Sequence, residues 1–243
     1  MIRVAPQFPP LIKGMAAGPA NPLTIATAEA QRGTDAGLLV WSLTDDRMRA
    51  ALVLAPETPL SHAASALVAC GVGLQNALGV LVPPETAVHL EWAGGIRLNG
   101  GHAGGMRLYS STQNADETPD WLIVSLELTM RLPDKAEIEP GETPDWTALD
   151  QEGAGEVDPI DLLEGWSKHS LIWLNELDHP NGLKTLYREW RGLVWKLGED
   201  TAVSLPGERV GGRFLGVDEN FGMILKTGEV TRLIPLTTLA ERV

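Results

Sequence analysis

The chain has 243 residues, of which 44% are hydrophobic and 21% charged. It is therefore long enough to bury a sizeable core and too apolar to be intrinsically disordered. Its 32 acidic residues outnumber 19 lysines and arginines, and the formal net charge of −13 argues against nucleic-acid binding, which needs cations to displace phosphate counterions. With one cysteine no internal disulfide can form, which favours the cytoplasm. We expect no signal peptide and no apolar run of the roughly 18 residues that would span a membrane.

Three segments begin with a helix-capping residue followed by proline, at Asn21, Thr58 and Asp158. The capping side chain can accept a hydrogen bond from an unpaired N–H, and proline suits the first helical position. Apolar spacing extends the second segment as one helix, with Gly79 as its C-cap. The predicted helices span residues 21–32, 58–78, 158–177 and 182–197.

Short runs rich in β-branched and aromatic residues lie between these helices and after them. The acidic stretch 131–157, which contains proline and glycine, is predicted to be a mobile surface loop. From about residue 203 only short strands and glycine turns follow, which is typical of a small SH3-like barrel. The order of elements favours an α+β fold over alternating βαβ units. The predicted strands are residues 38–41, 50–54, 88–92, 96–98, 106–109 and 121–130.

Two pairs of glycines, Gly94-Gly95 and Gly104-Gly105, flank an eight-residue segment that contains His102. Their backbone amides could cradle an anion. The same glycines could instead form two tight hairpin turns, and both interpretations stay open.

Reactive and metal-binding side chains are sparse. Cys70 lies inside a predicted helix with no cation near it in sequence, so a structural role is favoured over a nucleophilic one. The five histidines show no metal-ligand spacing, and no metal site is predicted.

Residues 88–106 read VHLEWAGGIRLNGGHAGGM. This segment resembles the signature of biotin–protein ligases in the biotin/lipoate ligase superfamily, approximately K-W-P-N-D-I-x-V-x-G-x-K-x-x-G-I. The matching residues are Trp92, Ile96, Leu98, Gly100, Gly105 and Met106.

The resemblance covers nearly the whole chain, because the predicted elements follow the family's order. It implies an α+β fold in which a mixed sheet packs with helices and a small SH3-like β-barrel follows. We therefore expect a ligase-like domain over residues 1–200 and a β-module over residues 201–243.

The resemblance also implies a reaction in which ATP and biotin or lipoate form an acyl-adenylate, which a lysine of a carrier protein then attacks. The family's glycine/arginine-rich nucleotide loop corresponds here to residues 42–49, which include Arg47 and Arg49. Glu91 and His102 stand where the family has lysines. The resemblance thus implies His102 as the catalytic residue. The implied ligand-binding residues are Arg47, Arg49, Trp92, Gly94, Gly95, Gly104 and Gly105.

Three functions stay open. The first is a divergent ligase that uses ATP, magnesium and biotin or lipoate. The second is a relative lacking ordinary ligase activity, a pseudoenzyme that binds a small acyl ligand or a biotin/lipoyl carrier domain. The third is an acyltransferase that uses Cys70. A homodimer is compatible with the resemblance, whereas nucleic-acid and membrane partners are not expected.

Overall fold

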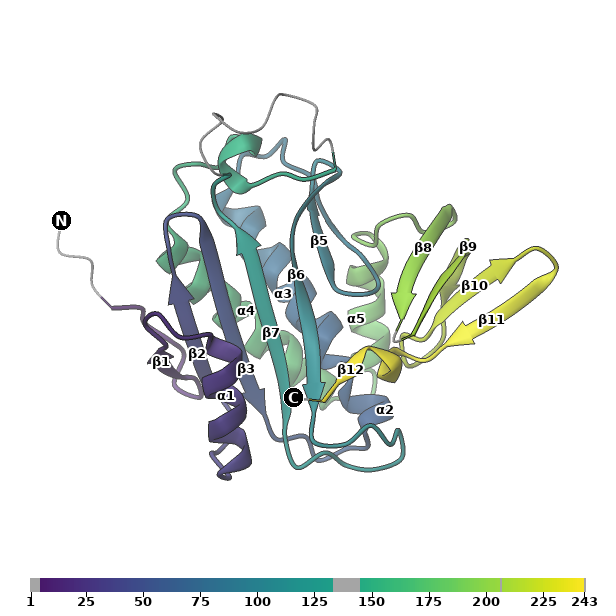
Figure 1. Cartoon of the computed structure of the whole chain (residues 1–243), viewed down its shortest axis with the longest axis horizontal. Helices are drawn as coiled ribbons and strands as arrows, with labels where there is room; N and C mark the ends of the chain where they lie inside the picture. The colour runs from purple at the N-terminus through teal and green to yellow at the C-terminus, as the bar shows by residue number, and fades with distance from the viewer. Residues whose placement is uncertain (1–4, 133–144, 206, 243) are drawn as a thin grey trace.

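The computed structural model describes residues 5–132, 145–205 and 207–242. Two sheets and five helices make up this part of the chain (Figure 1). The helices are α1 (Pro22–Gln31), α2 (Leu60–Ala63), α3 (Ala66–Leu81), α4 (Pro159–Leu177) and α5 (Gly182–Arg191), with 3-10 turns η1 (Leu149–Glu152) and η2 (Leu236–Leu239).

The large sheet is mixed and has the strand order β1-β2-β3-β7-β6-β5-β4, with β12 beside β6. Strand β1 pairs in parallel with β2, and β12 pairs in parallel with β6. The other neighbouring strands are antiparallel. Its strands are β1 (Lys13–Ala16), β2 (Leu38–Leu43), β3 (Arg47–Leu54), β4 (Val88–Leu90), β5 (Gly95–Leu98), β6 (Gly101–Ser110), β7 (Leu122–Thr129) and β12 (Ala240–Glu241).

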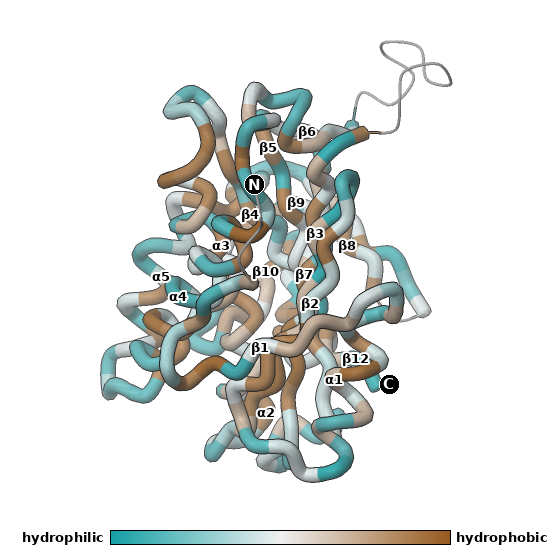
Figure 2. Tube along the Cα trace, turned by 90° about the vertical axis from the view of Figure 1, so that its left-hand side faces the viewer, coloured by the Kyte–Doolittle hydropathy of each residue, from teal (hydrophilic) through white to brown (hydrophobic). Residues whose placement is uncertain are grey.

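Helices cover both faces of the large sheet, with α3 and α4 behind it and α1 in front (Figure 1). Side chains alternate between the two faces of a strand. Leu39 and Leu52 therefore belong to the core that contains α3 and α4, whereas Val40 and Val53 belong to the core around α1. Figure 2 shows apolar stretches through the middle of the molecule and hydrophilic ones on its outer loops.

Two of the predicted caps form as expected. Asn21 accepts a hydrogen bond from the N–H of Leu23, at 2.9 Å, and Asp158 accepts one from the N–H of Ile160, at 2.8 Å. Both helices have proline in their first turn. Helices α1 and α4 are thus confirmed close to their predicted bounds.

The single helix predicted over residues 58–78 is wrong in two respects. It is divided into α2 and α3, and near the break the Ser65 hydroxyl bonds back to the carbonyl of His62 at 2.7 Å. Gly79 lies inside α3, which ends at Leu81. The C-cap residue Val82 has an extended backbone (ψ 160°), the conformation that the following Pro83 favours.

The segment Leu60–Leu81 is, by length and composition, apolar enough to cross a membrane. Our expectation that no run reaches this length was therefore wrong. Because 72% of its most apolar window is buried inside the fold, the segment, which comprises α2 and α3, belongs to the core of the domain.

The helix predicted over residues 182–197 also ends early, at Arg191. After turn residues 192–193, Val194 forms an isolated parallel bridge with Leu90 at the edge of β4. The N–H of Leu90 bonds to the carbonyl of Leu193, and the N–H of Trp195 bonds to the carbonyl of Leu90, each at 2.8 Å. This pairing carries residues 193–195 from α5 toward the second sheet.

The C-terminal β-module is an antiparallel meander with the order β11-β10-β9-β8. The predicted fold class, α+β with a small C-terminal β-module, is confirmed. The strands are β8 (Asp200–Leu205), β9 (Glu208–Val217), β10 (Met223–Thr227) and β11 (Val230–Ile234).

The segment predicted as an acidic surface loop is only partly described. Residues 133–144 lie outside the described residues. Thr147, Ala148 and Leu149 are buried and η1 begins at Leu149, so this part of the prediction was wrong.

Candidate functional site

A cavity of about 1210 Å³ lies between the large sheet and the C-terminal β-module. Its walls come from strands β3, β5, β6, β7, β8 and β9 and from the chain that links α5 to β8. Arg49 does not line it but contacts Glu127, which does. The cavity thus brings together all but one of the predicted site residues: Arg47, Trp92, Gly94, Gly95, His102, Gly104 and Gly105.

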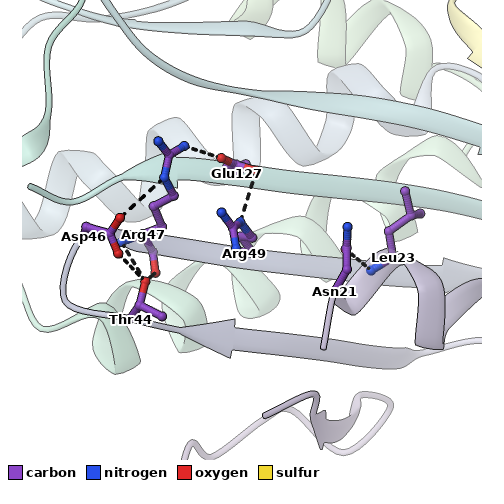
Figure 3. A network of polar contacts seen from close by, with 7 residues as sticks. All are labelled: Asn21, Leu23, Thr44, Asp46, Arg47, Arg49 and Glu127. Carbon is purple, nitrogen blue, oxygen red and sulfur yellow. Dashed lines mark hydrogen bonds and ion pairs between the residues drawn. The ribbon is translucent and has the colours of Figure 1, made fainter. Parts of the chain in front are cut away.

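Arg47 and Arg49 share one carboxylate on the neighbouring strand (Figure 3). Arg49 lies opposite Glu127 in the β3–β7 register, and its Nε is 3.2 Å from Glu127 Oε2. Arg47 makes a short bond to the other oxygen of Glu127, and its Nε is 3.6 Å from Asp46 Oδ2. A hydrogen bond from Thr44 lowers the pKa of Asp46 and so keeps it charged. Both arginine charges are therefore balanced by acidic side chains.

Two further arginines that line the cavity, Arg97 and Arg107, are paired as well. Arg97 Nε is 2.5 Å from Glu91 Oε1, and Arg97 Nη1 donates to the carbonyl of Gly100 at 2.7 Å. The Arg97 guanidinium also lies 5.2 Å from the centre of the Trp195 ring. Arg107 Nη1 is 3.6 Å from Glu241 Oε1. Each of these cavity-lining arginines thus faces a carboxylate.

His102 lies at the start of β6. Its backbone N–H bonds to the carbonyl of Asp145 at 2.6 Å, and its imidazole meets the Trp146 ring edge-on, with centres 4.6 Å apart. Burial lowers the pKa of His102, Glu91 raises it by a smaller amount, and Arg97 lowers it. The imidazole is therefore mostly neutral at pH 7 and does not replace the positive charge of a lysine.

The glycines of the site allow close packing of backbone. Gly94 has φ +91°, and a Cβ there would lie 2.3 Å from the carbonyl oxygen of Met106. A Cβ on Gly104 would lie 2.2 Å from the carbonyl oxygen of Glu127. The Gly94 amide donates to the carbonyl of Glu91 at 2.9 Å, which closes a tight turn. At Gly94 the hairpin interpretation is therefore the better one, since its amide is not available to an anion.

Trp92 connects the cavity to the C-terminal module. Only 4% of the residue is exposed, and its indole Nε1 donates a 2.7 Å hydrogen bond to the carbonyl of Phe221. The Phe221 ring packs edge-on against Trp190, with centres 5.6 Å apart. Trp92 thus fixes the β9–β10 turn against the turn that precedes β5.

Cys70 is fully buried between α3 and α4, where the indole of Trp166 bonds to its carbonyl at 3.1 Å. Burial raises the pKa of the thiol to about 12, with a smaller opposing effect from Ser170. Cys70 does not line the cavity. These properties favour the structural role and argue against a nucleophile.

Sequence reasoning missed several residues of the cavity wall, among them Trp146, Trp195, Lys196 and Arg209. These four lie 44 or more positions after His102 and belong to no motif there. A parallel bridge with His102 brings Trp146 to the glycine-rich strands, and the fold of the linker and of the C-terminal module brings the other three. Within the described residues no cluster of three or more His, Cys, Asp or Glu side chains could hold a metal ion.

The fold and this site define a class of protein. The chain belongs to the biotin/lipoate A/B protein ligase family, whose model matches residues 8–192. A second model, Domain of unknown function (DUF4444), matches residues 197–242. No curated protein matches the chain.

Among solved structures, a biotin protein ligase-like protein of unknown function from Silicibacter sp. TM1040 is 48% identical, with a TM-score of 0.89 over 98% of this chain and 100% of that one. Biotin protein ligase from Aquifex aeolicus in complex with biotin and ATP is 16% identical, with a TM-score of 0.69 over 92% and 95% of the chains. Biotin protein ligase from Leishmania major in complex with biotinyl-5-AMP is 14% identical, with a TM-score of 0.56 over 93% and 99%. The last two show similarity of fold.

Proposed function

We propose that this protein binds a small acyl ligand in the cavity beside β5 and β6 and lacks ordinary acyl-adenylate ligase activity. Two solved relatives of the same fold are complexes with biotin and ATP or with biotinyl-5-AMP, which supports the choice of ligand class. His102, Gly95, Gly104 and Gly105 would contact the ligand. Trp92 would position the turn beside it.

One observation carries this proposal: the arginines of the large sheet that line the cavity are each engaged by a carboxylate. Glu127 bonds to Arg47, Glu91 to Arg97, and Glu241 lies beside Arg107. Adenylate formation needs positive groups that stabilise the charge developing on the phosphates. A cation already neutralised by a neighbouring carboxylate supplies little of that stabilisation.

The same residues fit a magnesium–ATP complex poorly. Glu91 and Glu127 accept bonds from arginines and Glu241 lies beside Arg107. Asp200 also lines the cavity, but within the described residues it belongs to no group of three or more acidic, histidine or cysteine side chains that could hold a metal ion. The proposed function therefore involves no magnesium–ATP complex.

A divergent ligase is the second candidate, and one observation favours it. Lys196 and Arg209 line the cavity from its other side. They could contact phosphates in place of the lysines at positions that Glu91 and His102 occupy here. The Cys70 acyltransferase is no longer a candidate, because the thiol is buried and away from the cavity.

Binding measurements test the proposal. Calorimetry with the intact chain should detect binding of biotin or lipoate. Incubation of the chain with ATP, biotin or lipoate and a biotin/lipoyl carrier domain should leave the lysines of that carrier domain unlabelled. Glu127→Gln should strengthen ATP binding, because it removes the charge that neutralises Arg47 and Arg49. ATP-dependent labelling of the carrier domain by the wild-type chain would overturn the proposal.

The domain boundary, the partners and the cellular location of the protein are also proposals. We place the domain boundary near residue 200, supported by the start of β8 at Asp200 and by the second family model from residue 197. A carrier domain is a candidate partner, a homodimer stays open, and the unpaired cysteine fits a cytoplasmic location.

A further inference from the structure

Two cations of the cavity wall differ from the arginines of the large sheet. Lys196 and Arg209 line the cavity and are exposed, and neither has an ion pair or side-chain hydrogen bond within the described part of the chain. Asp200 is on the same wall. The wall formed by the linker and the C-terminal module therefore carries two cations against one carboxylate.

The backbone holds Lys196 in an unusual conformation. Its φ is +57°, in the left-handed region that long side chains rarely adopt. The chain is fixed on both sides of it, since Trp195 N–H bonds to the carbonyl of Leu90 at 2.8 Å and Gly198 N–H bonds to that of Phe214 at 2.7 Å. Such conformations persist where the surrounding structure imposes them, and they concentrate at ligand sites.

An aromatic ring lies next to Lys196 in the cavity wall. The Trp195 ring lines the cavity and is held by the Arg97 guanidinium, 5.2 Å from the ring centre. Phe214 and Met223 of the module also line it. The cavity thus combines two cations that have no ion pair within the described residues with the aromatic ring of Trp195, which suits a ligand with an anionic head and an apolar body.

We infer that Lys196 and Arg209 bind the anionic head group, carboxylate or phosphate, of the ligand, and that the C-terminal module supplies one wall of the binding site. This inference rests on the ligand cavity of the proposed function. It gives a role to residues 197–242, which match a domain of unknown function.

Titration calorimetry on the intact chain, with lipoate, biotin and ATP as probes, tests the inference. Lys196→Asn removes the charge with a residue that tolerates the left-handed region, and Arg209→Ala removes the second charge. Each should weaken binding of an anionic probe by about 10-fold to 100-fold, the scale of one charge-assisted hydrogen bond. Lys226→Ala, at an exposed position of β10 outside the cavity wall, is the matched control and should change nothing. Circular dichroism verifies that each variant is folded.

The uncharged amides of lipoate and biotin distinguish the source of the anion. If the head group is a carboxylate, the amides bind at least tenfold more weakly than the acids. If it is a phosphate, amides and acids bind alike, and only ATP is sensitive to the two variants. The inference is wrong if the wild-type chain binds none of the three anions, or if both variants bind them as the wild type does. Pyrophosphate release by the wild type would contradict the proposed function alone and leave this inference standing.

Discussion

The indole Nε1 of Trp92 donates a 2.7 Å hydrogen bond to the carbonyl oxygen of Phe221, 129 residues further along the chain. It joins the turn before β5 to the turn between β9 and β10 across a buried contact. The family signature that includes Trp92 is therefore used, at this residue, to attach the C-terminal module beside the cavity.

Trp92→Phe removes the donor and leaves a buried carbonyl without its partner. We expect a loss of about 1–3 kcal/mol in the free energy of unfolding, measured by urea denaturation. Trp146→Phe is the control, because Trp146 is 58% exposed, and its effect should stay within about 0.5 kcal/mol. Equal effects of the two replacements would mean that the Trp92 hydrogen bond contributes little.

Replacement by alanine is expected to have opposite effects on stability at two glycines, Gly79 and Gly94. Gly79 lies inside α3, and a Cβ there meets only the Gln75 amide, at 3.7 Å, so Gly79→Ala should stabilise the protein by about 0.5–1 kcal/mol. Gly94 has φ +91° and no room for a Cβ, so Gly94→Ala should cost at least about 1–2 kcal/mol. Thermal unfolding of both variants tests this, and destabilisation by Gly79→Ala would restore its predicted role as a helix cap.

Cys70 should be unreactive in the folded protein. Burial raises the pKa of its thiol to about 12, so little thiolate is present and reagents lack access. A disulfide reagent such as DTNB should react at least about a hundredfold more slowly in native buffer than in urea, where the thiol is exposed and ordinary. Rapid native labelling would reopen the acyltransferase hypothesis.

His102 should titrate below the ordinary histidine pKa of 6.5. Because folding lowers this pKa, the unfolded chain binds more protons, so the contribution of His102 to stability is complete above pH 6.5 and is lost as the pH falls through the folded value. NMR of the imidazole gives the midpoint. Glu91→Gln should lower it further, since Glu91 raises the pKa of His102. A midpoint above 6.5 would mean that a nearby carboxylate raises the pKa of His102 by more than burial lowers it.

Local signals allowed much of the fold to be predicted. The caps at Asn21 and Asp158 satisfy backbone groups within two residues of themselves, so α1 and α4 could be predicted from short stretches of sequence. Strand β1 could not, because its four residues are mostly exposed and its pairing with β2 is set by tertiary structure. The end of α5 depends on the pairing of residue 193 with β4, which no local pattern indicates.

The position of the candidate site could be predicted from the sequence, but which of its cations are paired with carboxylates could not. The glycine-rich segment identified the strands that line the cavity. Whether Arg47 is available to a ligand depends on Glu127, 80 residues away, and only the β3–β7 register brings the two together. Lys196 and Arg209 reach the cavity only through the docking of the C-terminal module, so no sequence spacing could have indicated them.

Pyrophosphate release from ATP in the presence of biotin or lipoate tests most directly whether carboxylate pairing has removed the ligase chemistry from this fold. We predict that the wild-type chain releases no pyrophosphate above the rate without biotin or lipoate, even at concentrations where the acid binds. Sustained pyrophosphate release that depends on biotin or lipoate would show that the paired arginines, or other cations of the cavity, still serve the phosphates, and it would contradict the account.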